Sequence, residues 1–199
     1  MLFTSTGMIE RNLDMGIDRI HQQAQKLERA GSDALAKQDY QTAANDFRKA
    51  AEKLRDAGDF DKSSFDFQRA GDALEGEGGL KQKAGDFKGA KTAFEGAATN
   101  LEDAGADALK TGSSTRHSTA EGYYGAAGTD RVHAGVYAQE THKKEEAAKN
   151  YRQGQTDLQL AGDEATKQGR NDTALDYYDK AEKAGKAADE VSGKPKSGH

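Results

Sequence analysis

The 199-residue sequence contains no cysteine, no tryptophan and a single proline. Without cysteine the chain has no disulfides, thiol nucleophiles or cysteine-ligated metal sites. Proline interrupts helices, so its scarcity fits long helices in one elongated body.

Long apolar runs are also missing. No stretch approaches the roughly 18 apolar residues of a membrane-spanning helix, so we expect no insertion into a membrane. The first residues, Met-Leu-Phe-Thr-Ser-Thr-Gly, show neither the basic region nor the apolar segment of a signal peptide. We therefore expect a cytoplasmic protein, with secretion without a cleaved signal peptide as the alternative.

The chain lacks blocks of one charge, because its 34 acidic and 29 basic residues are mixed along the sequence. A nucleic-acid binder needs a basic patch, so we expect no nucleic-acid partner. Only 34% of the residues are hydrophobic, many of them alanine, and the mean hydropathy is −0.97. The core must be thin, and stability must be summed over many small interfaces. Partial disorder is the alternative.

A 27-residue repeat organises what is present and argues against disorder. One leucine or aromatic position recurs at that spacing, with a three-residue insertion before its fifth occurrence: Leu13, Tyr40, Phe67, Phe94, Tyr124, Tyr151 and Tyr178. Small residues accompany it four positions earlier and three positions later. A fixed period indicates a repeat architecture, in which each unit buries its apolar face against its neighbours.

Within a unit, small and apolar residues alternate in steps of four and three, as they do from Ala36 to Ala57 and from Ile9 to Ala30. This heptad stripe keeps one face of a helix toward a partner helix. Each stripe is followed by a glycine that is expected to end the helix, with His142 as the exception: Gly31, Gly58, Gly85, Gly112 and Gly169. Asp59, Asp86 and Asp172 are expected to cap the helices that follow.

We therefore predict an all-α fold of about seven antiparallel helices, each about 22 residues long, arranged as an α-solenoid or an elongated bundle. Residues 9–191 form one domain with a longer internal loop at 112–119. Residues 1–8 and 192–199 lack the stripe and are expected to be mobile tails.

The later units carry a glycine in mid-stripe, at Gly78, Gly105, Gly135 and Gly162. Close packing of helix backbones explains such glycines, and a hinge is the alternative. The run of three glycines at positions 76, 78 and 79 is the strongest candidate for an interrupted helix.

Several units contain a turn, an aromatic residue and spaced alanines in one pattern. Examples are Gln38-Asp39-Tyr40 with Ala43, and Gly85-Asp86-Phe87 with Ala90. This pattern resembles the tetratricopeptide superfamily, and residues 43–51 are similar to the soluble NSF-attachment proteins. The period differs from the family's 34 residues, and the signature tryptophan and proline are absent. The resemblance implies a stack of helical hairpins that presents a surface to another protein.

The sequence offers little for chemistry. The histidines show no metal-binding spacing, and no phosphate-binding glycine loop is present. Ser113, Ser114 and His117 lie together, but no acid that would orient the histidine can be identified. We expect no enzymatic activity, no cofactor and no metal.

Aromatic residues outside the stripe are the candidate partner contacts. They are Tyr123, Tyr177, Tyr137 and Phe65. Half-exposed tyrosines often anchor interfaces, because they bury a large area while keeping a polar tip in water. Widening of the buried face is the alternative.

These observations favour a non-enzymatic interaction module, a scaffold, adaptor or chaperone that binds another protein or peptide. Two alternatives stay open. One is a bacterial secreted effector or toxin-associated helical protein, and the other is a structural protein that assembles into homo-oligomers.

Overall fold

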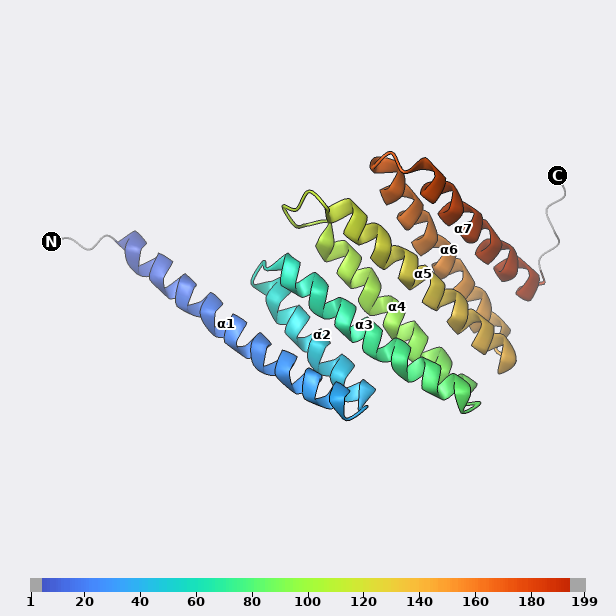
Figure 1. The fold of residues 1–199 in the computed structure, drawn as a ribbon, viewed down its shortest axis with the longest axis horizontal. Helices are drawn as coiled ribbons and strands as arrows, with labels where there is room; N and C mark the ends of the chain where they lie inside the picture. The colour runs from blue at the N-terminus through green and yellow to red at the C-terminus, as the bar shows by residue number, and fades with distance from the viewer. Residues whose placement is uncertain (1–4, 194–199) are drawn as a thin grey trace.

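The computed structural model describes residues 5–193, with side chains described from residue 16 onward. This part of the chain forms seven α-helices that follow one another side by side (Figure 1). They are α1 (Ser5–Ala36), α2 (Tyr40–Asp56), α3 (Phe60–Lys83), α4 (Phe87–Ala108), α5 (Arg116–Glu140), α6 (Lys144–Lys167) and α7 (Asn171–Val191). The all-α prediction is confirmed.

The expected mobile tails fall largely outside the described residues, at 1–4 and 194–199. Residues 5–8, assigned to the first tail, belong to α1 instead. The internal loop predicted at 112–119 lies at residues 109–115, because the last four of the predicted residues already belong to α5.

The other described turns have three residues each and share one backbone conformation. The middle residue is left-handed in each: Gln38, Gly58, Gly85, His142 and Gly169 have φ between 58° and 78°. The amide of the third residue then donates to a carbonyl of the preceding helix, as from Asp86 N to Lys81 O at 2.9 Å. These bonds close a Schellman motif, which reverses the chain and makes consecutive helices antiparallel.

The predicted helix ends are correct at Gly58, Gly85 and Gly169 and wrong at Gly31 and Gly112. Gly31 lies inside α1, and the chain turns one heptad later, at Gln38. A Cβ atom at Gly31 would meet Phe47 Cε1 at 2.8 Å, so this glycine serves packing. The shift makes α1 32 residues long and α2 only 17.

The predicted caps divide in a similar way. Asp59 and Asp86 accept from the amides of Lys62 and Gly89, as expected. Asp172 is not a cap, because it lies in the first turn of α7 after Arg170. Gly112 is likewise no helix stop, since α4 has already ended at Ala108.

The heptad stripe is buried from α2 onward. Its small residue after the main aromatic is at most 1% exposed in five units: Ala43, Ala70, Ala97, Ala127 and Ala181. The stripe predicted for the first unit holds only in part: Ile20 and Leu27 are half-buried, but Ala30 is exposed, and Gly31 and Ala34 are buried instead. As an end helix, α1 packs on α2 with a shifted face.

Each mid-stripe glycine receives the main aromatic ring of the next helix. A Cβ atom would lie 2.6–3.0 Å from that ring in all four pairs: Gly78 with Phe94, Gly105 with Tyr124, Gly135 with Tyr151, and Gly162 with Tyr178. Close packing is therefore confirmed, although an aromatic ring and not a helix backbone approaches each glycine. The expected interruption at residues 76–79 is wrong, because α3 continues through them.

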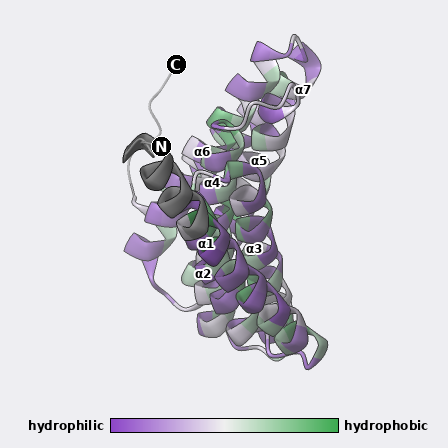
Figure 2. Ribbon diagram, turned by 90° about the vertical axis from the view of Figure 1, so that its left-hand side faces the viewer, coloured by the Kyte–Doolittle hydropathy of each residue, from purple (hydrophilic) through white to green (hydrophobic). Residues whose placement is uncertain are grey.

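The helices form two layers, with α2, α4 and α6 on one side and α3, α5 and α7 on the other (Figure 2). Each helix packs mainly on its neighbours in the chain, and α1 and α7 lie at opposite ends (Figure 1). The described residues thus form an open array of repeats rather than a closed bundle. Long polar side chains join helices of one layer, as Arg55 of α2 does with Asp107 of α4.

Candidate functional site

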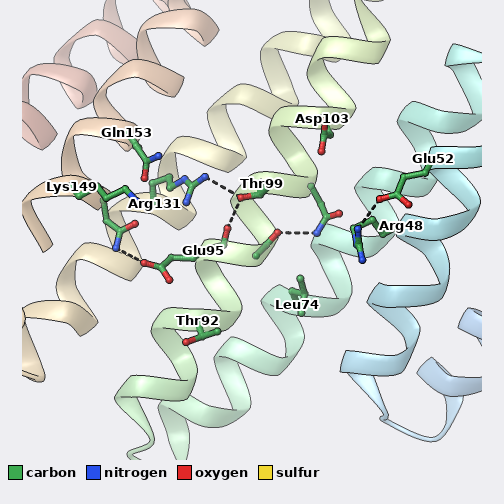
Figure 3. Close-up of a pocket in the computed structure, with 13 residues that line it drawn as sticks. Arg48, Glu52, Leu74, Thr92, Glu95, Thr99, Asp103, Arg131, Lys149 and Gln153 are labelled. Carbon is green, nitrogen blue, oxygen red and sulfur yellow. Dashed lines mark hydrogen bonds and ion pairs between the residues drawn. The ribbon is translucent and has the colours of Figure 1, made fainter. Parts of the chain in front are cut away.

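A groove of about 710 Å³ runs across the layer formed by α2, α4 and α6. In Figure 3, α4 lies at its base, Arg48 and Glu52 project from α2, and Lys149 and Gln153 project from α6. Three helices that are not consecutive in the chain therefore contribute to one concave surface.

The base of the groove is open because the outward face of α4 carries small side chains. Thr92, Gly96 and Thr99 follow one another there at steps of four and three. At Gly96 a Cβ atom would meet Leu74 Cδ1 at 2.9 Å, so only glycine fits without displacing this buried leucine. The long side chains come from the flanking helices and form the walls.

The wall along α6 is held by charge-assisted hydrogen bonds. Arg131 of α5 donates to Glu102 at 2.8 and 3.1 Å and to Thr99 Oγ1 at 3.0 Å. Asn150 Nδ2 donates to Glu95 Oε1 at 2.7 Å. Bonds of this kind are among the stronger polar contacts in proteins, and they fix the wall before any ligand arrives.

One acceptor in the groove has no donor. Asn100 is 5% exposed, and its Nδ2 donates to Gly96 O at 2.8 Å, but its Oδ1 has no hydrogen-bond partner. A buried polar atom without a partner costs about 1–3 kcal/mol. In the same groove, the exposed Lys149 ammonium makes no hydrogen bond or ion pair with residues 16–193. The groove therefore offers an unpaired cation, whereas the unpartnered oxygen of Asn100 lies beneath its surface.

A second, apolar cavity of about 320 Å³ lies between α5, α6 and α7. Val132, Tyr151 and Leu158 line it, with Lys180 and Lys183 at its edge. Both lysines already pair with acids on their own helix, Asp176 and Asp179, at 2.7 and 2.6 Å. The cavity therefore has no unpaired lysine comparable to Lys149 of the groove.

The four aromatic candidates do not gather on one surface. Phe65 of α3 is 57% exposed and lies 5.8 Å from the guanidinium of Arg69. Tyr123 of α5 is half-buried and donates to Gln68 Oε1 at 3.0 Å. Tyr177 of α7 is half-buried beneath Lys180, and its ring fills the space beside Gly125. Their role in partner binding stays a prediction.

Tyr137 differs from its expected half-exposed position. It is 7% exposed and stacks on Phe87 and Phe94, with centroid distances of 5.9 and 5.7 Å. Burial also raises its pKa. The ring belongs to the core between α4 and α5, because α5 presents two adjacent faces to its neighbours rather than one narrow stripe.

His117, which lies in the first turn of α5 rather than in the long loop, has an orienting acid that the sequence did not reveal. His117 Nδ1 lies 2.6 Å from Oε2 of Glu164, which also binds Lys167. Burial opposes ionisation of Glu164, but the hydrogen bonds from Lys167 and His117 outweigh it and hold its pKa below the usual value. His117 Nε2 faces the Arg116 side chain at 3.4 Å and not a hydroxyl. The pair lacks a nucleophile at that nitrogen.

Within the described part of the chain, no three His, Cys, Asp or Glu residues are placed to hold a metal ion. None of its helices is long and apolar enough to cross a membrane. The expectations of no cofactor and no metal stay predictions.

The groove residues were missed at the level of the sequence. Thr92, Thr99 and Lys149 look like ordinary solvated helix positions, and nothing marks Asn100 as buried. The one available signal was the row of small residues on α4 outside the stripe, which leaves room between two flanking helices.

Comparison with known proteins supports the architecture. No protein-family model matches the sequence, and no curated protein matches it. A solved structure named DHF58 filament is similar with a TM-score of 0.65 and 13% identity, covering 92% of this chain and 87% of that one. A crystal structure of MamA protein aligns over 89% of this chain and 97% of that one at 14% identity, but its TM-score of 0.21 is too low to support an argument. The first likeness shows a shared helical fold and nothing more.

Proposed function

We propose that this protein is a non-enzymatic interaction module that binds an extended polypeptide segment in the groove over α4. The observation that carries the proposal is the preformed groove itself, in which the side chains of α2 and α6 stand on either side of the small side chains of α4. A peptide backbone supplies N–H and C=O groups at regular spacing, and polar wall residues such as Glu52, Lys149 and Gln153 can pair with them.

The charges of the groove support a polypeptide over a nucleic acid. Arg48, Arg131 and Lys149 are balanced by Glu52, Glu95 and Asp103. A lining of mixed charge does not favour a phosphate backbone. It suits a segment with both charges and polar side chains, bound mainly through shape and hydrogen bonds.

The resemblance to tetratricopeptide repeats supports protein binding only in general terms. We propose that the array acts as a scaffold, adaptor or chaperone by presenting its surface to another protein. The similarity to the soluble NSF-attachment proteins adds no more specific role. Phe65, Tyr123 and Tyr177 are candidates for additional contacts outside the groove.

The test is selection of binding peptides from a random 12-residue library, followed by fluorescence anisotropy with two variants. Thr92→Trp fills the groove. Thr156→Trp is the matched control, because Thr156 is also exposed and, like Thr92, donates to the carbonyl four residues earlier at 3.1 Å. We expect selected peptides to bind the wild type and the control, and to lose at least tenfold in affinity for Thr92→Trp. Equal binding by both variants, or no selected peptide, contradicts the proposal.

We propose that this chain is a monomer and does not assemble into a filament. The end helix α7 carries three lysine–acid pairs at (i, i+4) spacing, starting at Asp176, Asp179 and Glu182. A polar face of this kind is typical of a capping repeat, which ends an array. Light scattering checks this: a monomer over a wide concentration range is the expected result.

A further inference from the structure

Three aspartates are buried against a glutamate from a helix two places along the chain. Their exposed fractions are 2%, 4% and 6% for Asp66, Asp130 and Asp157. The pairs are Asp66 with Glu28, Asp130 with Glu75, and Asp157 with Glu102. They join α1 to α3, α3 to α5, and α4 to α6.

A carboxylate has acceptors only, so two ionised carboxylates cannot hydrogen-bond to each other. In each pair, the Oδ2 atom of the aspartate is buried and has no hydrogen-bond partner. One proton on the aspartate removes both difficulties, because it cancels a charge and turns an acceptor into a donor.

The surrounding charges differ among the three sites. At Asp66, Glu28 faces from α1. Arg69, which lies in α3 with Asp66, approaches the Oδ1 atom of Asp66 at 3.3 Å. At Asp130, both Glu75 and Asp72 face from α3, next to Arg131 of its own helix. At Asp157, Glu102 faces from α4 and Arg131 from α5. The arginines offset only part of the repulsion.

We propose that these three carboxyl pairs are proton-dependent clasps, which tie alternate helices of the array to each other and release as the pH rises from mildly acidic to mildly alkaline. The Asp157 clasp shares Arg131 with the groove, so its release also loosens the groove wall.

The direction follows from linkage. Burial, followed by the facing carboxylates, raises the pKa of Asp66 and of Asp157 from 3.8 to about 7, and that of Asp130 to about 9. The folded state therefore holds more protons than the unfolded chain above pH 3.8. The stabilisation is complete below that pH and is lost as the pH rises through 7 and then 9.

The experiment is urea denaturation of the full chain, followed by circular dichroism, at pH values from 5 to 9.5. We expect the unfolding constant of the wild type to rise by about tenfold per pH unit for each proton released. The triple variant Asp66→Asn, Asp130→Asn, Asp157→Asn keeps the shapes and supplies permanent donors, so it should lose this rise. The control triple variant Asp61→Asn, Asp172→Asn, Asp176→Asn replaces the same number of aspartates at exposed sites and should keep the pH slope of the wild type.

A wild type whose stability does not fall over this range overturns the proposal, as does a triple variant with an unchanged pH slope. Carbon-13 NMR titration of the aspartate carboxyls in the wild type decides the matter independently of whether the variant folds. Three aspartates titrating above pH 6 are expected, and titration of every aspartate below pH 5 contradicts the clasps.

Discussion

Individual glycines of this chain have opposite roles that depend on what stands opposite them. Gly78 and Gly79 are adjacent in α3, yet only Gly78 faces a ring, that of Phe94. Phe94 is itself held between Tyr137, at 5.7 Å, and His133, at 5.2 Å, so it cannot yield easily. Nothing lies within 4 Å of a Cβ atom at Gly79.

These neighbours give a matched pair of predictions. Gly78→Ala should destabilise the protein by about 1–2 kcal/mol, because overpacking costs about 1–3 kcal/mol and outweighs the gain in helix propensity. Gly79→Ala should stabilise it by about 0.5–1 kcal/mol through that gain alone. Urea denaturation midpoints measure both. Stabilisation by Gly78→Ala would show that the two helices do not pack this closely.

At the scale of the element, the sequence predicts the helices and most of the turns, because these depend on its periodicity. The 27-residue spacing identified the helices, and glycine identified the turns at Gly58, Gly85 and Gly169. It did not identify the turn at Gln38, because a non-glycine residue in the left-handed conformation carries no signal in its side chain. The glycine expected there, Gly31, was needed for packing instead.

The groove could not be predicted for a related reason. It depends on the separation of α2 and α6 above α4, which no local pattern encodes. The same limit applies to the buried acids, since Asp66 and Asp130 lie beside stripe positions and look like surface residues in the sequence.

Ties between alternate helices are the second feature at this scale. Asp107 of α4 is fully buried and accepts from Arg55 Nε at 2.7 Å, Ser63 Oγ at 2.6 Å and Lys110 Nζ at 3.0 Å. Burial alone would lower the pKa of Arg55, but its bonds to Asp107 and Asp103 outweigh that and raise it. The guanidinium also lies 4.3 Å from the ring of Phe67.

Removing this tie should be costly. Arg55→Leu leaves a buried carboxylate with two of its three donors, so we expect a loss of about 2–3 kcal/mol in stability. The matched change Arg48→Leu breaks only the exposed pair with Glu52 and should cost less than about 0.5 kcal/mol. Equal losses in urea denaturation would mean that the buried tie contributes no more than a surface pair.

At the scale of the whole molecule, the insertion in the fifth repeat raises the question of one body or two. The connection at 109–115 is longer than the other turns, yet α4 and α5 pack directly across it. Ala98, Leu101 and Ala127 form one buried cluster between them. The side chains, and not the length of the connection, make the array continuous.

This continuity predicts how the chain tolerates extra residues. Eight glycine and serine residues inserted after Ser114 should cost about 0.6–1 kcal/mol, since loop closure depends only weakly on length. The same insertion after Gly85 should cost about 2 kcal/mol, because it lengthens a three-residue turn and also breaks the Schellman bond from Asp86 N to Lys81 O. Urea denaturation should show one cooperative transition for both proteins. Two separate transitions after the Ser114 insertion would mean that the helices on either side of the loop fold as independent bodies.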